Sequence, residues 1–289
     1  MGIDIATLRG WIGRTETRSE FLDPKPAQRL AATLDAPDAD LRDGMPLPPL
    51  FHWLYFLPAC RLSELAEDGH PARGAFLPPV PLPRRMWAAS SIEFSAPLAF
   101  GEIVVRTTEI IDVALKEGRS GPLIFVKLKH ALADAAGCTA LVEMQDIVYR
   151  TPPSAADAGS HPIRAAQSAR WVRQMTPDAK LLFRYSALTF NSHRIHYDRP
   201  YAVDVEGYAG VVVHGPLQAT LLAHHLLREM PSARFRHFAF RAERPLFDGT
   251  PIFLCAQPSP DPLSLQLWSC DAAGVRHTQA FVTLQAPPV

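Results

Sequence analysis

The chain has 289 residues, of which 47% are hydrophobic, and its 29 basic residues balance its 29 acidic residues, giving a formal net charge of zero. This balance argues against nucleic acid or an anionic membrane as the main partner, because both attract positively charged surfaces. The apolar content is that of a globular protein, and the length is long for one domain and comfortable for two.

The four cysteines are widely scattered and include no Cys-x-x-Cys pair: Cys60, Cys138, Cys255 and Cys270. In a chain of this size, this spacing indicates free thiols in a reducing compartment. The N-terminus lacks a basic stretch followed by an apolar run, and the most apolar segment, residues 48–60, is too short to cross a bilayer. We therefore expect a soluble, cytoplasmic protein without a membrane partner.

The first 150 residues are predicted to form helical pieces followed by strands. Residues 4–35 have helical periodicity in places, interrupted by prolines, and an aromatic-rich helix is predicted over 50–65. The pattern then changes to segments rich in β-branched and aromatic residues, with turn-forming sequences between them. Strands are predicted at 85–94, 103–115, 123–133 and 141–149.

The second half repeats this plan after a segment rich in Ala, Ser, Pro and Gly, residues 151–167, which we interpret as an interdomain linker. A polar loop at 185–202 leads to a strand near 208–213 and a helix at about 217–230. Four more strands are predicted, at 236–243, 251–257, 263–270 and 276–284. The repeated order predicts an α+β protein made of two copies of one unit, residues 1–150 and 168–289, in which a helix lies across a curled antiparallel sheet.

The segment from 185 to 202 contains two histidines, an asparagine, an aspartate and two arginines, and is too polar to be core. Soon after it, His214 and Gly215 precede the predicted helix. A candidate base followed by a helix N-terminus, which attracts negative charge, is suited to activating a carbonyl substrate. This pairing indicates an enzyme.

Several positions of the segment are in register with the signature of the MaoC-like hydratases: Tyr185, Leu188, Thr189, Ile195, His196 and Ala202. Two dipeptides depart from it, because Phe190-Asn191 replaces Gly-Asp and His193-Arg194 replaces Asn-Pro. In this variant form the segment resembles the mitochondrial 3-hydroxyacyl-thioester dehydratases type 2 and the bacterial mesaconyl-C4-CoA (3-methylfumaryl-CoA) hydratases. Other parts of the chain resemble the same group, among them residues 69–71, 116–122 and 145–150.

The resemblance implies a double hot-dog fold, with the hydratase motif in the C-terminal hot-dog and an N-terminal hot-dog opened to hold the acyl group. It also implies reversible hydration of an α,β-unsaturated acyl thioester. No cofactor is expected, since the CoA is part of the substrate.

The resemblance assigns the catalytic roles to His196 and Asn191. A neutral imidazole can polarise water for addition to an activated double bond, or take the C2 proton in the reverse direction. Asn191 stands where the common hydratases have a carboxylate; it cannot take a proton, but its amide can hold a water molecule. The alternatives are a hydrogen-bonded loop histidine and an Asx turn.

The expected substrate-binding residues are Tyr185, His193, Arg194, His214 and Gly215. The N–H of Gly215 at the helix N-terminus would hold the thioester carbonyl as it becomes enolate-like. The guanidinium of Arg194 would pair with a substrate carboxylate or a CoA phosphate, unless it is an ordinary surface charge. His193 and His196 are three residues apart, but no third histidine or cysteine has a convincing spacing, so no metal site is expected.

The favoured substrates are small branched or dicarboxylic esters of the mesaconyl-C4-CoA or itaconyl-CoA type. A dehydratase of fatty acid synthesis, acting on CoA or acyl-carrier-protein thioesters, would instead need an apolar tunnel. A hot-dog thioesterase would need a carboxylate near the thioester, which Asn191 does not supply. A non-catalytic acyl-CoA-binding module is the alternative from another class, and monomer and homodimer are both open.

Overall fold

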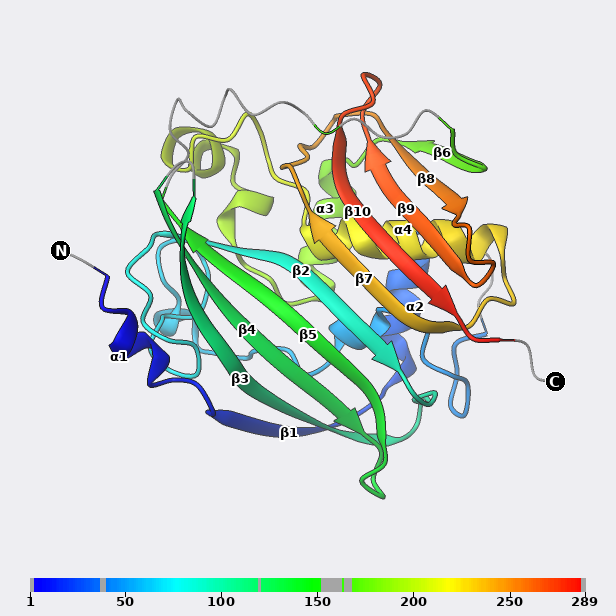
Figure 1. Ribbon diagram of the computed structural model, residues 1–289, viewed down its shortest axis with the longest axis horizontal. Coiled ribbons are helices and arrows are strands. Elements are labelled where there is room, and N and C mark those ends of the chain that lie inside the picture. The colour runs from blue at the N-terminus through cyan, green and yellow to red at the C-terminus, as the bar shows by residue number, and fades with distance from the viewer. Residues whose placement is uncertain (1–2, 37–39, 119–120, 152–162, 164–167, 287–289) are drawn as a thin grey trace.

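The computed structural model (Figure 1) describes residues 3–36, 40–118, 121–151, 163 and 168–286. Ten strands in these residues form one continuous sheet in which all neighbours are antiparallel. From one edge to the other they are β1 (Thr15–Phe21), β3 (Ile103–Gly118), β4 (Gly121–Ala133), β5 (Thr139–Arg150), β2 (Arg84–Phe94), β7 (Phe235–Ala242), β10 (Arg276–Leu284), β9 (Ser264–Cys270), β8 (Ile252–Pro258) and β6 (Trp171–Met175).

The longest helix of the described residues, α4 (Gly215–Glu229), lies across the C-terminal half of this sheet, behind β7 to β9 in Figure 1. Its apolar side chains recur at helical spacing, so that Leu217, Leu222 and Leu226 are all fully buried against the strands. Phe238 and Phe240 alternate toward the same core from β7. The predicted α+β architecture, with a helix followed by four strands in the second half, is confirmed.

The two halves are joined by the pairing of β2 with β7, which runs from Ala89 opposite Arg241 to Glu93 opposite His237. Because β2 also pairs with β5, the sheet passes from one half to the other without a break. Loops from both halves therefore meet over the inner face of the sheet, close to the start of α4.

The helix predicted over 50–65 is wrong. Only short 3-10 turns are found there, η1 (Phe51–Leu54) and η2 (Leu62–Glu64). Leu50 and Phe56 have positive φ values of 69° and 57°, so the chain leaves the helical region on both sides of the first turn. The inner face of the N-terminal half is therefore covered by turns and loops, and the two halves differ in this respect.

The strand predicted near 208–213 is also wrong, apart from a single bridge between Val212 and Phe247. The backbone of Val212 is used elsewhere, since its N–H donates to Ile195 and its carbonyl oxygen faces His196. The predicted loop at 185–202 contains more structure than expected. It begins inside α3 (Ala179–Leu188) and includes the short helices η4 (Arg194–His196) and η5 (Tyr201–Val205).

The helical pieces expected within residues 4–35 are found as α1 (Ile5–Arg9) and α2 (Pro24–Thr33), whereas the edge strands β1 and β6 and helix α3 were not predicted. Pro24 does not break α2 but begins it, at a position where the missing N–H costs nothing. The predicted linker, 151–167, lies outside the described residues except for residues 151 and 163, so the domain boundaries stay a prediction. No helix in the described residues is long and apolar enough to span a membrane.

Candidate active site

The turn that follows α3 is docked on a loop of the N-terminal half. The N–H of Arg194 donates to the carbonyl oxygen of Asp68 at 2.9 Å, and the hydroxyl of Ser192 donates to the carbonyl oxygen of Gly69 at 2.5 Å. Gly69 has a φ of +85°, and a Cβ at this position would lie only 1.9 Å from the carbonyl oxygen of Ser192. Glycine is therefore required for the two halves to meet here.

His196 lies at the centre of this junction and is 8% exposed. Its Nδ1 is 2.7 Å from the carbonyl oxygen of Val212, which can only accept, so Nδ1 carries the proton and Nε2 has a free lone pair. Burial lowers the pKa of His196 to about 4, against the opposing effect of the hydrogen bond to Val212. His196 is therefore a neutral hydrogen-bond acceptor at physiological pH.

His214 forms the wall behind this base. The rings of His196 and His214 stack with centroids 3.7 Å apart and planes inclined by 20°, and the ring of Tyr185 meets His214 edge-on at 5.1 Å. The Nε2 of His214 is 2.8 Å from the hydroxyl of Ser186, a residue that the sequence did not single out. Burial lowers the pKa of His214 well below its ordinary value, so it is also neutral. These contacts hold the plane of the His196 ring.

Gly215 is the first residue of α4, directly after His214. The first N–H groups of a helix have no partner within it, so this end of α4 presents donors toward the junction. A Cβ on Gly215 would lie 3.4 Å from the carbonyl oxygen of Trp87, an ordinary contact. Packing alone therefore does not demand glycine here, and the predicted role in holding a carbonyl oxygen stays a prediction.

Asn191 is half-buried, and its side-chain oxygen accepts the N–H of His193 at 3.0 Å. This contact is an Asx turn, the alternative interpretation of this residue. The turn orients the backbone that leads to His196, and it leaves the amide N–H₂ group available. The predicted role of Asn191 in holding water stays a prediction.

The two arginines of the motif have partners within the protein. The guanidinium of Arg194 donates twice to one carboxylate oxygen of Asp198, at 2.8 and 2.9 Å, and lies 4.1 Å from the ring centroid of Tyr201. Arg199 forms an ion pair with Asp248 at 2.8 Å. In this structure the Arg194 side chain stabilises the motif through Asp198 and Tyr201, and its contact with substrate stays a prediction.

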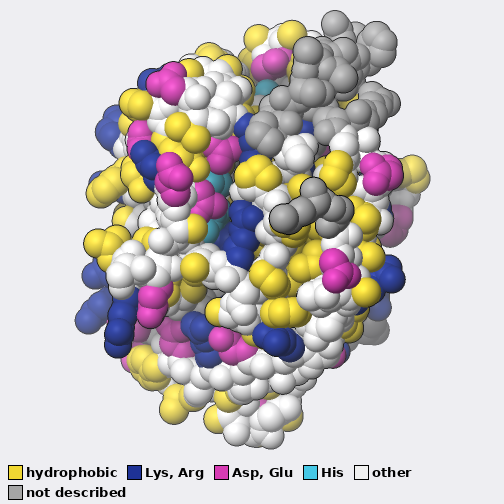
Figure 2. All heavy atoms as spheres, turned by 90° about the vertical axis from the view of Figure 1, so that its left-hand side faces the viewer, with side chains coloured by type: hydrophobic (Ala, Val, Ile, Leu, Met, Phe, Trp, Pro, Cys, Tyr) yellow, Lys and Arg dark blue, Asp and Glu magenta, His cyan; other side chains and the backbone are white. Residues whose placement is uncertain are grey.

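Two titratable side chains of the N-terminal half also belong to the site and were not predicted: Asp68 and His70. The ring of His70 lies 4.0 Å from that of His193, which in turn lies 5.3 Å from that of His196. On the face shown in Figure 2, histidine side chains lie in a hollow beside basic and acidic side chains. The only sequence signal was the resemblance of residues 69–71 to the related group, which carried no role.

These neighbours explain the charge states of the cluster. Burial and then the charges of His70 and His196 lower the pKa of His193 far below its ordinary value. Burial lowers the pKa of His70 to about 4, although its hydrogen bond to Asp68 raises it. Burial raises the pKa of Asp68, but the hydrogen bond and charge of His70 outweigh this effect and lower it overall. The site therefore combines neutral imidazoles with one carboxylate.

Asp68, His70 and His193 could also hold a metal ion, because one ligand atom from each lies within 4.8 Å of the others. Two imidazoles and a carboxylate are common ligands of divalent transition metals. The sequence considered His193 together with His196, whereas this set joins His193 to two residues of the other half, and the expectation of no metal site stays a prediction. The Nδ1 of His70 already faces Asp68, so a metal bound through that atom would replace a hydrogen bond.

The interior of the N-terminal half beside the site is polar and aromatic. Glu143 is fully buried and accepts hydrogen bonds from the indole of Trp53 at 3.0 Å and the hydroxyl of Ser90 at 2.6 Å. Its carboxylate also lies 3.2 Å from the Nε2 of His52, whose hydrogen bond and charge outweigh the effect of burial and lower the pKa of Glu143 to about 2. The ring of Trp53 packs edge-on against Trp87 at 5.1 Å and Phe240 at 5.8 Å.

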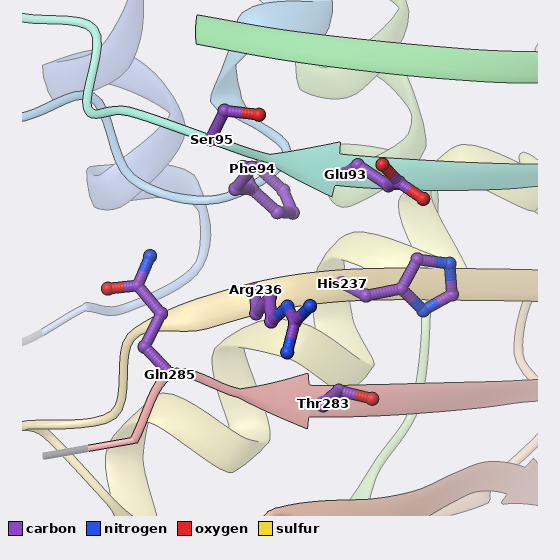
Figure 3. Close-up of a pocket in the computed structure, with 7 residues that line it drawn as sticks. All are labelled: Glu93, Phe94, Ser95, Arg236, His237, Thr283 and Gln285. Atoms are coloured by element: carbon purple, nitrogen blue, oxygen red, sulfur yellow. The ribbon is translucent and has the colours of Figure 1, made fainter.

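Two surface grooves lie away from the histidine cluster formed by His70, His193, His196 and His214. One, of about 590 Å³, is shown in Figure 3 and follows the ends of β2, β7 and β10; it is lined by Glu93, Phe94, Ser95, Arg236, His237, Thr283 and Gln285. The other, of about 420 Å³, lies beside Phe247 and His277. Neither holds the base and helix N-terminus that the chemistry needs, so we assign the candidate active site to the histidine cluster.

Comparisons with known proteins show the family of this chain. The family model described as hydroxyacyl-thioester dehydratase type 2 matches residues 50–248. The mesaconyl-C(4)-CoA hydratase of Chloroflexus aurantiacus is 45% identical, over 91% of this chain and 93% of its own length. The mitochondrial hydroxyacyl-thioester dehydratase type 2 of Schizosaccharomyces pombe is 26% identical, over 82% of this chain and 88% of its own.

Solved structures show the same fold at low sequence identity. A MaoC-like dehydratase superposes with a TM-score of 0.73 at 15% identity, covering 97% of this chain and all of the other. A Mycobacterium tuberculosis protein described as having a double hotdog fold superposes with a TM-score of 0.56 at 15% identity, covering 95% of this chain and 96% of the other. The double hot-dog prediction is therefore confirmed.

Proposed function

Since the chain belongs to the hydroxyacyl-thioester dehydratase type 2 family, we propose that it is a hydro-lyase acting on small dicarboxylic or branched acyl-CoA esters of the mesaconyl-C4-CoA type. The reaction is reversible addition of water to an α,β-unsaturated thioester. The observation that carries this proposal is the buried, neutral His196, oriented by Val212 beside the N-terminus of α4.

Each part of this arrangement has a task in the reaction. The Nε2 of His196 accepts a hydrogen bond from a water molecule and polarises it for attack on C3. The N–H of Gly215 donates to the thioester oxygen, which becomes negatively charged as the C3–O bond forms. Asn191 holds the turn from which His193 and His196 project, and its amide N–H₂ group donates a hydrogen bond to the water in this proposal.

The residues next to the site favour a substrate with a short acyl group. Trp53, Trp87 and Phe240 pack together beside the site, and the buried carboxylate of Glu143 accepts the indole N–H of Trp53. A long alkyl chain would need an apolar tunnel at this place. The mesaconyl-C4-CoA and itaconyl-CoA types fit these surroundings better than the fatty acyl thioesters of a biosynthetic dehydratase.

Arg85 is the better candidate for binding a distal carboxylate. It lies opposite Tyr149 in the pairing of β2 with β5, and its positive charge lowers the pKa values of His70 and His193. Arg194, in contrast, is already paired with Asp198. A guanidinium close to the imidazoles suits a small dicarboxylic ester.

The proposal is tested by following the loss of enoyl-thioester absorbance with the purified protein and a panel of esters. We expect the highest kcat/KM with mesaconyl-C4-CoA or itaconyl-CoA, lower values with crotonyl-CoA, and little turnover of long-chain enoyl-CoA or of acyl-carrier-protein thioesters. Preference for long chains would replace this proposal by the biosynthetic dehydratase. Binding of the esters without turnover would show a non-catalytic acyl-CoA-binding protein.

We further propose that the enzyme acts in the cytoplasm, where thiols stay reduced. Its four cysteines are all free, and Cys255 and Cys270 are buried.

A further inference from the structure

We propose that His70, paired with Asp68, is a second catalytic residue of this site and carries the proton between the water and C2 of the acyl group. The inference deepens the proposed function and rests on it. It gives the N-terminal half a chemical role, and it supplies the carboxylate that Asn191 does not provide.

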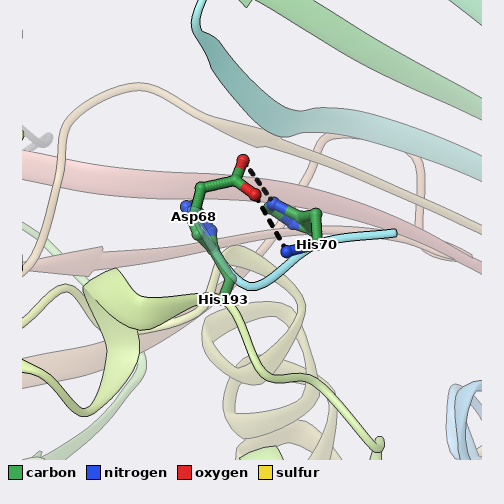
Figure 4. Close-up of side chains that lie close together, drawn as sticks. All are labelled: Asp68, His70 and His193. Atoms are coloured by element: carbon green, nitrogen blue, oxygen red, sulfur yellow. Dashed lines mark hydrogen bonds and ion pairs between the residues drawn. The ribbon is translucent and has the colours of Figure 1, made fainter. Parts of the chain in front are cut away.

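The pair is held in one orientation (Figure 4). One carboxylate oxygen of Asp68 accepts the backbone N–H of His70 at 2.9 Å, and the other lies 3.1 Å from its Nδ1. Because Asp68 carries a negative charge at neutral pH, it accepts the proton of Nδ1, and the Nε2 of His70 has a free lone pair. A carboxylate in this position fixes the tautomer of a histidine and stabilises the imidazolium that forms during proton transfer.

The loop that carries the pair is fixed against the hydratase motif. The carbonyl oxygens of Asp68 and Gly69 accept hydrogen bonds from Arg194 and Ser192, so the loop meets the motif on both sides of His193. His193 lies between the other two imidazoles, with ring centroids 4.0 Å from His70 and 5.3 Å from His196. His70 and His196 therefore flank the same residue, His193, where the two halves meet.

The two imidazoles have different partners and hence different tasks. His196 is held by a neutral carbonyl, whereas His70 is held by a carboxylate, so an imidazolium is better stabilised at His70. In hydration, the water donates one hydrogen bond to each Nε2. As its oxygen bonds to C3, one O–H bond breaks and that proton moves to His70, which then returns it to C2. One water is consumed, the thioester stays intact, and both imidazoles end neutral.

Two substitutions test this role, with one matched control. His70→Gln removes the proton carrier. Asp68→Asn keeps an oxygen for the backbone N–H of His70 but turns an amide donor toward Nδ1, which forces the other tautomer. His237→Gln is the control, because His237 contacts Ser91 away from the histidine cluster.

We expect both variants to lose about 100-fold or more in kcat with little change in KM, as for a lost general acid–base group. The kcat of the double variant should be no lower than that of the less active single variant, because the two residues act as a unit. The His237 control should keep wild-type activity. Retention of more than about one third of kcat by His70→Gln overturns the proposal while leaving the hydratase intact.

A second measurement does not depend on turnover. Nitrogen NMR of the labelled protein should show His70 protonated on Nδ1 in the wild type and on Nε2 in Asp68→Asn, with unchanged circular dichroism. The same tautomer in both would overturn the pairing. If a chelator abolishes wild-type activity and Zn²⁺ restores it, Asp68, His70 and His193 are metal ligands and the proton-carrier role is wrong. A wild-type protein that hydrates none of the esters would overturn the proposed function, and this role with it.

Discussion

The Nδ1 of His196 is bound to the carbonyl oxygen of Val212, and the N–H of Val212 donates to the carbonyl oxygen of Ile195, at 2.7 and 2.8 Å. This reciprocal contact joins the motif turn to the segment that leads into α4. It fixes the imidazole tautomer and places the ring at the start of that helix. The base and the expected oxyanion donor are therefore positioned by one structural unit.

His196→Ala should reduce kcat/KM by a factor on the order of 10² to 10⁴, because the acceptor that polarises the water is lost. The melting temperature should change much less, since the backbone contact between Val212 and Ile195 is kept. Steady-state kinetics on crotonyl-CoA and a thermal melt check both expectations. More than about a tenth of wild-type kcat/KM in the folded variant would contradict the assigned role.

Asn191→Asp should be tolerated, because a carboxylate oxygen can accept the N–H of His193 as the amide oxygen does. Asn191→Leu should be severely impaired, since it removes both this acceptor and the amide donors. Kinetics of the two variants, with circular dichroism to verify folding, distinguish the cases. If Leu is as active as the wild type, neither the turn nor the water contact matters.

Arg85→Met should lower kcat/KM for mesaconyl-C4-CoA by roughly 1.5 to 3 kcal/mol in transition-state binding, the scale of a hydrogen bond to a charged group. Crotonyl-CoA, which lacks a distal carboxylate, should be little affected. Arg194→Met is the matched control, since it deletes the same charge from a guanidinium already paired with Asp198. A selective loss in Arg194→Met, with none in Arg85→Met, would move the carboxylate site to Arg194.

Gly69→Ala should separate the two halves at the active site, because the new Cβ would meet the carbonyl oxygen of Ser192 at 1.9 Å. Gly137→Ala is a matched control: its φ is +86°, against +85° at Gly69, but no atom lies within 4 Å of the added Cβ. The control should lose about 1 to 2 kcal/mol of unfolding free energy, because alanine is strained at a positive φ. Gly69→Ala should lose more and should also lose activity; equal effects would mean that the docking contact can relax.

The stability should fall as the pH is lowered from about 6.5 to 4.5. The pKa values of His70 and His196 are lowered to about 4 by burial, so in this range the unfolded chain binds protons that the native protein does not. By about pH 4, each of these histidines has lowered the free energy of unfolding by on the order of 3 kcal/mol. Glu143, whose pKa is lowered from 4.5 to about 2, contributes stability that is lost as the pH falls from about 4.5 to 2. Urea unfolding at several pH values measures the slope, and His70→Gln/His196→Gln should reduce it without abolishing it, because burial also lowers the pKa values of His193 and His214.

Much of the fold is predictable because local pattern and tertiary packing agree there. Strands β3 and β5 are long and rich in β-branched residues, β7 is rich in aromatic residues, and α4 has a continuous apolar face. The helix expected over 50–65 failed because aromatic residues at helical spacing also suit a loop that fills a core. Leu50 and Phe56 adopt positive φ values there, which no composition rule favours.

The amino-acid sequence by itself determined the double hot-dog family, the hydratase motif and the histidine that carries it, because these depend on spacing within one segment. Only the tertiary structure decided that Arg194 is paired with Asp198, that the oxygen of Asn191 forms a turn, and that Asp68 and His70 lie beside His193. Asp68 and His193 are more than a hundred positions apart along the chain. They meet because the pairing of β2 with β7 joins the halves and Gly69 lets two backbones touch, and such contacts leave no periodic signal in sequence.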